Sequence, residues 1–341
     1  MTRSIAVPPA LLVALMVTTA TGAGWCQQLA FVSIRDGNPE IYVVNADGTG
    51  LKRLTANAAE DIRPAWSPDG GLITFVSDRD GDQDIWVMNP RGERQTNITN
   101  TDAFDDSPCW SPDGARLLFV SDRDGNSEIY MCDRDGANAR NLSNDPSWDG
   151  MPAWAPTGEW LAYVTDRTAD PDVMLVPADL SSALNVTMHE AWEGDPIFSP
   201  DGKLLAFRTH RDGNIGVYAY DIANRTLINI SANEVWNEPP DFGPDGRIAY
   251  ASSPAGHREI IIANLATGER VSITNTETNE WGPQWSPDGS KIAFLSDREG
   301  DVRLYVCNAD GSGVVEVGGG PVMDMPCTWR PERRLTTAND G

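Results

Sequence analysis

The stretch that decides the fold is WSPDG at Trp110–Gly114, followed by LFVSDRDG at Leu118–Gly125 and EIYMCDRDG at Glu128–Gly136. An aromatic residue before a Pro-containing turn returns seven times, at separations of 44, 44, 44, 44, 43 and 44 residues; the positions are Trp66, Trp110, Trp154, Phe198, Phe242, Trp285 and Trp329. Such self-similarity means that one supersecondary unit is stacked or arranged in a circle. The repeat runs through nearly all 341 residues, so we expect one closed domain rather than two.

Residues 62–98 show how one unit is built. Ile62–Trp66 is predicted to be a short strand that ends in a Ser-Pro-Asp-Gly turn, where Pro presets one dihedral and Gly accepts a positive φ. Leu72–Ser77 (LITFVS) is β-branched and aromatic, as expected of a buried strand. Asp84–Asn89 and Gln95–Thr99 supply a third and a fourth strand after further turns. Four antiparallel strands in about 44 residues predict one blade of a β-propeller, an all-β fold.

The two ends of the repeat indicate how the ring closes. The chain enters the repeat at Leu29–Ser33, without a first strand, and leaves it at Pro326–Trp329 with an unpaired first strand. We therefore expect the last strand to complete the first blade, which gives seven blades and no large unpaired edge. The innermost strands are predicted to carry prolines, whose missing N–H costs little beside a channel; these are Pro64, Pro108, Pro152, Pro196, Pro240 and Pro283.

The consensus W-S-P-D-G, I-A-F-x-S-D-R-D-G, E-I-Y-V-x-N-x-D-G and L-T resembles the WD40-like repeat (PD40) of TolB-type propellers. The resemblance covers about residues 28–331 and implies a propeller fold. The resemblance implies a six-bladed ring behind a separate α/β domain for TolB itself, whereas seven blades are expected directly after the N-terminal segment here. The chain is therefore similar to the family but is not expected to be TolB itself.

Composition limits the classes of partner. The chain has 26 basic and 50 acidic residues, a formal net charge of -24, which disfavours nucleic acid and attracts cations or basic surfaces. Residues 1–26 combine Arg3, an apolar segment at Ala10–Val17 and small residues, which predicts a secretory signal peptide cleaved after Ala23 or Cys26. No later stretch is apolar enough to span a membrane. We expect a periplasmic or secreted monomer with a propeller at 27–331 and a loose tail at 332–341.

Export permits disulfides, but the cysteine pattern does not suggest a framework. Cys132 and Cys307 occupy the same repeat position in different blades, and Cys109 and Cys132 are predicted to lie on strands separated by a third. We expect mostly buried free thiols.

The loops between one blade and the next are predicted to share a face with the turns between second and third strands, at the mouth of the channel. An acid stands three residues before the repeated Pro at Asp61, Asp105, Asp149, Glu193 and Glu280. Aromatic residues accompany these acids at Phe104, Trp148, Trp192, Trp236 and Trp281. Aromatic faces stack on sugars or apolar side chains and hold cations, and carboxylates accept hydrogen bonds. These ten residues are the predicted ligand-binding site.

Two other interpretations of this face remain open. Arginines in the neighbouring turns could neutralise the acids in blade-to-blade ion pairs; they are Arg35, Arg79, Arg123, Arg167, Arg211 and Arg298. His189, His210 and His257 map to the same face and could ligate a metal, as in the oligogalacturonate lyases, which look like seven-bladed propellers with a His-rich metal site. Their motif is not matched here residue by residue.

The sequence favours a non-catalytic, exported binding module without a cofactor. No G-x-S-x-G elbow, P-loop or H-E-x-x-H motif is present. The expected ligand is a protein, a peptide or a glycan, and resemblance to TolB-type rings favours a protein. The alternative is a metal-dependent carbohydrate-active enzyme that uses the three histidines.

Overall fold

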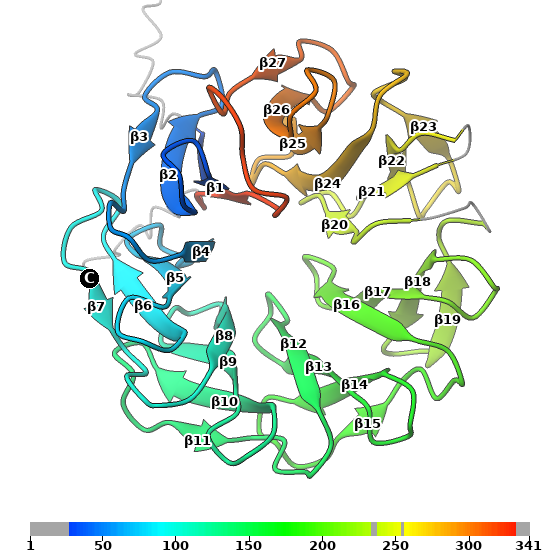
Figure 1. Cartoon of the computed structure of the whole chain (residues 1–341). Coiled ribbons are helices and arrows are strands. Elements are labelled where there is room, and N and C mark those ends of the chain that lie inside the picture. Colours follow the sequence, from blue (N-terminus) through cyan, green and yellow to red (C-terminus); the bar gives the residue numbers. More distant parts are fainter. Residues whose placement is uncertain (1–26, 233–236, 254–255, 332–341) are drawn as a thin grey trace, which may run out of the picture.

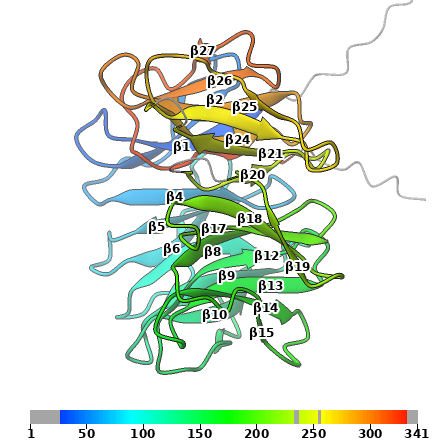
Figure 2. The same ribbon diagram turned by 90° about the vertical axis from the view of Figure 1, so that its right-hand side faces the viewer.

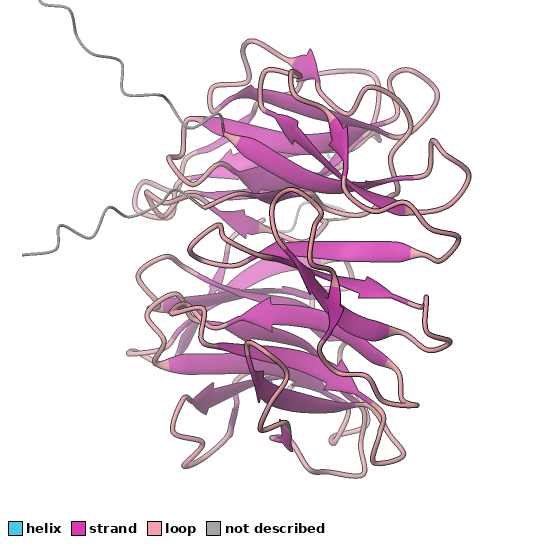
Figure 3. Ribbon diagram, turned by 90° about the vertical axis from the view of Figure 1, so that its left-hand side faces the viewer, coloured by secondary structure: helices cyan, strands magenta, loops and turns pink. Residues whose placement is uncertain are grey.

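The computed structural model describes residues 27–232, 237–253 and 256–331. The predicted signal peptide, the predicted tail and Trp236 lie outside these residues. The described chain forms seven four-stranded antiparallel sheets arranged in a ring, as the sequence predicted (Figure 1). Strands make up the wall of the ring and loops project from its two faces (Figures 2 and 3). The described residues contain no helix, and hence none that could cross a membrane.

Blades are numbered here from the N-terminus, and strands in chain order. Blade 1 contains β28 (Thr328–Trp329), β1 (Gln28–Ser33), β2 (Glu40–Asn45) and β3 (Lys52–Arg53); blade 2 contains β4 (Asp61–Trp66), β5 (Ile73–Ser77), β6 (Asp84–Met88) and β7 (Thr96–Asn97). Blade 3 contains β8 (Asp105–Trp110), β9 (Arg116–Ser121), β10 (Glu128–Asp133) and β11 (Arg140–Asn141); blade 4 contains β12 (Asp149–Trp154), β13 (Trp160–Thr165), β14 (Asp172–Pro177) and β15 (Leu184–Asn185). Blade 5 contains β16 (Glu193–Phe198), β17 (Leu204–Thr209), β18 (Gly216–Asp221) and β19 (Thr226–Asn229); blade 6 contains β20 (Asp241–Phe242), β21 (Ile248–Ser252), β22 (Glu259–Ala263) and β23 (Arg270–Ser272). Blade 7 contains β24 (Glu280–Trp285), β25 (Lys291–Ser296), β26 (Arg303–Asn308) and β27 (Val315–Glu316).

The ring closes through the two ends of the repeat. β28 pairs antiparallel with β1, with Leu29 opposite Trp329 and Ala30 opposite Thr328. The Trp329 indole N–H donates to the Gln284 carbonyl of blade 7 at 2.9 Å, so the last strand joins the first and last blades. The predicted closure is confirmed.

The innermost strands contain a bulge that the sequence did not predict. In blade 2, Ile62 pairs with Val76 and Ala65 with Thr74, so β4 carries one extra residue between these pairs. The residue before the repeated proline has a positive φ in five blades; these are Arg63 (52°), Ser107 (54°), Met151 (52°), Asp195 (53°) and Gly282 (59°). Because proline has no N–H for the ladder, the bulge places it where no partner is needed.

The core lies between blades. All five residues of β5 are buried, because both faces of each middle strand are covered by neighbouring blades. Trp110 belongs to the same buried cluster as Phe75 of blade 2, and its indole N–H donates to the Ala65 carbonyl at 3.3 Å. Trp110 therefore fastens blade 3 to blade 2, as Trp329 fastens blade 1 to blade 7. The described cysteines Cys109, Cys132, Cys307 and Cys327 are free, as predicted.

Candidate ligand-binding site at the mouth of the ring

The mouth face is defined here as the face that carries the loops between successive blades and the turns between second and third strands. Five innermost strands begin on this face with an acid whose side chain is fully buried, and each acid pairs with an arginine of its own blade. The pairs are Asp61–Arg79 (2.7 Å), Asp105–Arg123 (3.0 Å), Asp149–Arg167 (3.1 Å), Glu193–Arg211 (3.1 Å) and Glu280–Arg298 (3.1 Å). The arginines neutralise the acids, as one of the open interpretations predicted, but each pair lies within one blade and not between blades, because acid and arginine are 18 residues apart on the same blade.

Each arginine is fixed by more than its acid. In blade 2 the Arg79 Nε donates to the Ser77 hydroxyl at 2.8 Å, and its guanidinium lies 5.3 Å from the Phe75 ring and 4.4 Å from the Trp86 ring. Such contacts hold the cation in place while it balances a buried carboxylate. A ligand on this face therefore meets the arginine before it meets the acid.

Burial acts strongly on two of the acids. Desolvation raises the pKa of the Asp149 and Glu193 carboxyls above their ordinary values, and hydrogen bonds and the paired arginine offset this only in part. A buried carboxylate that lost its arginine would be costly. The pairs are thus part of the framework of the mouth.

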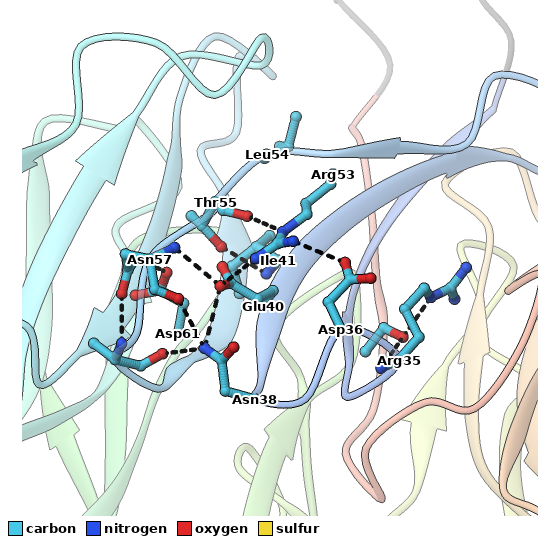
Figure 4. A network of polar contacts seen from close by, with 12 residues as sticks. Arg35, Asp36, Asn38, Glu40, Ile41, Arg53, Leu54, Thr55, Asn57 and Asp61 are labelled. Carbon is cyan, nitrogen blue, oxygen red and sulfur yellow. Dashed lines mark hydrogen bonds and ion pairs between the residues drawn. The ribbon is translucent and has the colours of Figure 1, made fainter.

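A second buried acid organises the loop between blades, as Figure 4 shows for blade 1. Glu40 accepts from Arg53 at 2.6 Å, from the Asn57 backbone N–H at 3.1 Å and from the Asn38 side chain at 3.1 Å. The Asn57 side chain then donates to Asp61 of blade 2 at 2.6 Å (Figure 4). This continuous network fixes the loop between the two blades and, with it, the rim of the mouth.

The predicted aromatic residues differ in exposure. Phe104 is 41% exposed and Trp148 is 38% exposed, whereas Trp192 is half-buried and Trp281 is only 7% exposed. The Trp281 indole N–H donates to Asp324 at 2.5 Å, and the Arg258 guanidinium lies 4.5 Å from its ring. Trp281 is therefore held inside the rim, and Phe104, Trp148 and Trp192 remain within reach of a ligand.

The indole rings of Trp148 and Trp192 each pack directly against a glycine, Gly150 and Gly194, and each glycine is called here the seat of its ring. A Cβ atom built on Gly150 would lie 2.3 Å from the Trp148 ring, and one on Gly194 would lie 2.4 Å from the Trp192 ring. Any other residue at these positions would push the indole off the innermost strand. Each tryptophan is followed two residues later by its glycine, a Trp-acid-Gly signal that sequence reasoning missed. The two indoles are thus flat platforms in equivalent positions of adjacent blades.

Next to Trp192 the structure departs from the repeat in a way that was not predicted. Arg208 stands in β17 where blades 2 to 4 have valine, and its Nε donates to Asp195 at 2.6 Å. Glu238 lies 3.8 Å from Arg208 and 2.9 Å from Arg258, which gives a chain of alternating charges across blades 5 and 6. The Arg208 guanidinium lies 5.3 Å from the Trp192 ring. One platform is therefore flanked by charges of both signs.

The ring encloses a channel cavity of about 420 Å³. Its wall includes Pro64, Pro108, Pro152 and Pro196 of the bulged innermost strands, together with Pro240, which directly precedes β20. Five of the six prolines predicted beside the channel thus line this cavity, and Pro283 does not. Asp195 also lines this cavity, so the chain of alternating charges extends from the rim to the channel wall.

The three histidines are not gathered. The His210 ring lies 5.3 Å from the Trp192 ring, the His257 Nε2 atom lies 3.3 Å from Glu259, and His189 is exposed. Within the described ranges, no group of three or more His, Cys, Asp or Glu side chains is placed to hold a metal ion.

Comparisons with known proteins agree with this architecture. Residues 24–102, 79–147, 128–250 and 240–336 match the profile of the TolB beta propeller domain (PD40). An uncharacterized peptidase of Bacillus subtilis (strain 168) is 36% identical over 74 residues, which are 21% of this chain and only 11% of that protein.

Two solved structures show the same fold at low identity. The putative TolB from Agrobacterium tumefaciens is 24% identical with a TM-score of 0.54, over 69% of this chain and 87% of that one. An oligogalacturonate lyase in complex with manganese is 15% identical with a TM-score of 0.67, over 83% of this chain and 86% of that one. The names of these relatives span several activities, so the fold is shared while the function is not specified.

Proposed function

Because the chain belongs to the TolB beta propeller family, we propose that it is an exported, non-catalytic module that binds a peptide segment of a partner protein at the mouth face. The observation that carries the proposal is the pair of glycine-seated platforms, Trp148 and Trp192. Flat indoles provide large contact areas at a low cost in conformational entropy. Export rests on the signal-like composition of residues 1–26.

A peptide fits the surroundings of the platforms better than a glycan. Charges of both signs flank Trp192 through Arg208, Glu238 and Arg258. A peptide offers ammonium, guanidinium and carboxylate groups to such a chain, whereas a neutral glycan offers hydroxyls alone. The formal net charge of -24 further favours a segment with positive charge.

In this proposal the five buried acids act by holding their arginines in place. Direct contact with a ligand, as the sequence suggested for Asp61, Asp105, Asp149, Glu193 and Glu280, would require displacement of an arginine from each buried carboxylate. We propose instead that these acids position the arginines, while Phe104, Trp148 and Trp192 contact the ligand.

The test begins with a phage library of random 12-residue peptides, and a glycan array is probed with the same protein. The best peptide is titrated calorimetrically into wild type, Trp148→Ala, Trp192→Ala and the double variant. Each single change should weaken binding by about 30-fold, the loss typical of a central aromatic anchor. Trp160→Ala is the matched control and should bind as wild type does, because Trp160 begins β13 at the end away from the mouth face. Binding that is insensitive to both platform changes, or confined to the glycan array, would overturn the proposal.

The enzymatic alternative has a separate test. Metal content of purified protein is measured by mass spectrometry for wild type and for the combined His189→Ala, His210→Ala and His257→Ala variant. The binding proposal predicts equal content in both proteins. Stoichiometric metal that is lost in the variant would instead support the metal-dependent enzyme.

A further inference from the structure

The turns between first and second strands lie on the face opposite the mouth, where they form a ring of contacts. In most blades the glycine of this turn lies so close to the preceding blade that an added Cβ atom would touch it. Such an atom would lie 3.2 Å from Arg330 for Gly70, 3.5 Å from Pro68 for Gly114, 3.5 Å from Pro112 for Gly158, 2.7 Å from Thr157 for Gly202 and 2.9 Å from Pro244 for Gly289. On Gly246 of blade 6 it would meet no described atom within 4 Å. The ring of contacts is therefore open between blades 5 and 6.

The turn of blade 6 is held against blade 7 instead. It begins with Gly243, where the other turns of this kind have serine or alanine, and a Cβ atom there would lie 3.0 Å from the Trp285 ring of blade 7. The Arg247 guanidinium lies 4.8 Å from the same ring, and the Trp285 backbone N–H donates to Asp241 at 2.6 Å. On the side of blade 5, Phe242 replaces the repeated tryptophan and has no indole N–H to donate to the preceding blade. Blade 6 is thus fastened on one side more than on the other.

A groove of about 630 Å³ lies between the turns of blades 5 and 6. Pro200 and Leu204 of blade 5 form apolar parts of its wall, as do Leu265 and Ala266 of blade 6. Its charged lining residues are Asp201, Lys203, Asp221, Asp245 and Arg247. Spaces of this volume, with apolar walls and a few polar groups, are typical of sites for small molecules.

The charges of the groove favour a cation. Both of its cations are paired with an acid of their own turn; the pairs are Lys203–Asp201 (3.1 Å) and Arg247–Asp245 (2.7 Å). Among the described residues Asp221 has no such partner, and it accepts from the Asn224 backbone N–H and side chain, both at 2.9 Å. These hydrogen bonds lower the pKa of the Asp221 carboxyl, so that it is charged at neutral pH. Three carboxylates and two cations leave the groove one negative charge, on a chain of net charge -24.

An organic cation suits this groove better than a metal ion. Within the described ranges, no group of three or more His, Cys, Asp or Glu side chains is placed to hold a metal ion. A metal ion would also make no use of the apolar wall at Leu204 and Leu265. An ammonium group on an apolar body uses both features, because its charge meets a carboxylate while its body leaves water.

We propose that the groove between blades 5 and 6 is a second binding site, which takes a small organic cation with an ammonium group on a compact apolar body. The ammonium donates to the Asp221 carboxylate, and the body lies between Leu204 and Leu265. The groove lies on the face opposite Trp148 and Trp192, so this proposal and the peptide proposal can each fail without the other.

The probes are 2-phenylethylamine, 2-phenylethanol and phenylacetate, which share a phenyl ring and differ in charge. Each is titrated by ligand-observed NMR into the wild-type chain and into the Trp148→Ala/Trp192→Ala double variant, which lacks the indoles that could hold a cation at the mouth. Both proteins should bind the amine with a Kd on the order of 1 mM, as expected for so small a ligand. The alcohol should bind about fivefold more weakly, and phenylacetate more weakly still because of its charge.

Variants of the groove then locate the bound amine. Asp221→Asn should weaken amine binding by about tenfold and remove the preference for the amine over the alcohol. Asp133→Asn is its matched control and should bind normally, because Asp133 ends β10 of blade 3 as Asp221 ends β18 and both variants have the same net charge. Ala266→Trp fills the groove from an exposed position and should block binding, whereas Ala137→Trp, at an exposed alanine in the corresponding turn of blade 3, should not.

Circular dichroism checks the fold of each variant before titration. Absence of saturable amine binding by wild type would overturn the proposal, as would loss of binding in the double variant, which would place the amine at the mouth. Unchanged amine affinity in folded Asp221→Asn or folded Ala266→Trp would also overturn it, as would binding of phenylacetate as tight as that of the amine.

Discussion

Asp241 should make the ring less stable as pH rises, and its replacement by asparagine should remove that dependence. Asp241 begins β20, where its Oδ2 accepts from the Trp285 backbone N–H at 2.6 Å. Burial raises the pKa of this carboxyl from 3.8 to about 7. Since the folded state retains a proton that the unfolded state loses, the contribution of Asp241 to stability is full below about pH 4 and is lost as pH rises from about 4 to 7.

The size of the effect follows from the same values. A difference between 3.8 and about 7 corresponds to about 4 kcal/mol. Because Asp241 is half-buried and solvent screens part of this effect, the expected cost is about 2–4 kcal/mol. Asp241→Asn keeps an oxygen that accepts from Trp285 but carries no charge. The variant should therefore exceed wild type in free energy of unfolding by about 2–4 kcal/mol at pH 8 and differ little at pH 4.

Guanidinium unfolding, followed by tryptophan fluorescence, measures this difference at each pH. Asp245→Asn is the control, because Asp245 lies in the next turn and its side chain is 49% exposed. It should show no comparable gain at pH 8. An Asp241→Asn difference that is the same at pH 4 and pH 8, or a loss of stability at pH 8, would refute the reasoning.

Three further predictions concern the framework and the platforms. Arg79→Met should destabilise the fold by about 3–5 kcal/mol in denaturant unfolding because it leaves Asp61 buried and unpaired, and Asp61→Leu added to it should restore part of the loss. Trp329→Ala should cost about 3–5 kcal/mol by the same measurement, since the closing strand loses its buried anchor; a change below about 1 kcal/mol would argue against closure through that strand. Gly194→Ala should displace the Trp192 ring and weaken the selected peptide about as much as loss of the ring does, with little effect on unfolding, and unaltered peptide affinity would argue against the seat.

Much of the fold could be predicted from the chain because its signals are local and repeated. The aromatic anchors, the Pro-Asp-Gly turns and the unpaired strand predicted at Pro326–Trp329 each follow from residue chemistry within one unit. The bulge at Arg63 could not be foreseen, because a left-handed residue before proline has no compositional signal at a non-glycine position. Its conformation is fixed by the neighbouring strand and not by local preference.

The site was predictable in position but less so in detail. The face and its aromatic rim follow from the topology, whereas the partner of Asp61 depends on how far the Arg79 side chain reaches within its own blade. Because these acids are buried, we interpret them as part of the framework and not as ligand contacts. The seats at Gly150 and Gly194 are visible in the sequence as the pattern Trp-acid-Gly. The reason for each glycine becomes evident only from the structure, where the indole ring lies too close to leave room for a Cβ atom.

Hydrogen exchange of the protein with and without the selected peptide tests the central claim most directly. Binding at the mouth should slow exchange in the interblade loops at 142–149 and 186–193, which carry the two tryptophan platforms. The turns on the opposite face at 155–159 and 199–203 should exchange at unchanged rates. Protection that appears in those opposite turns, and not in the two interblade loops, would contradict the account.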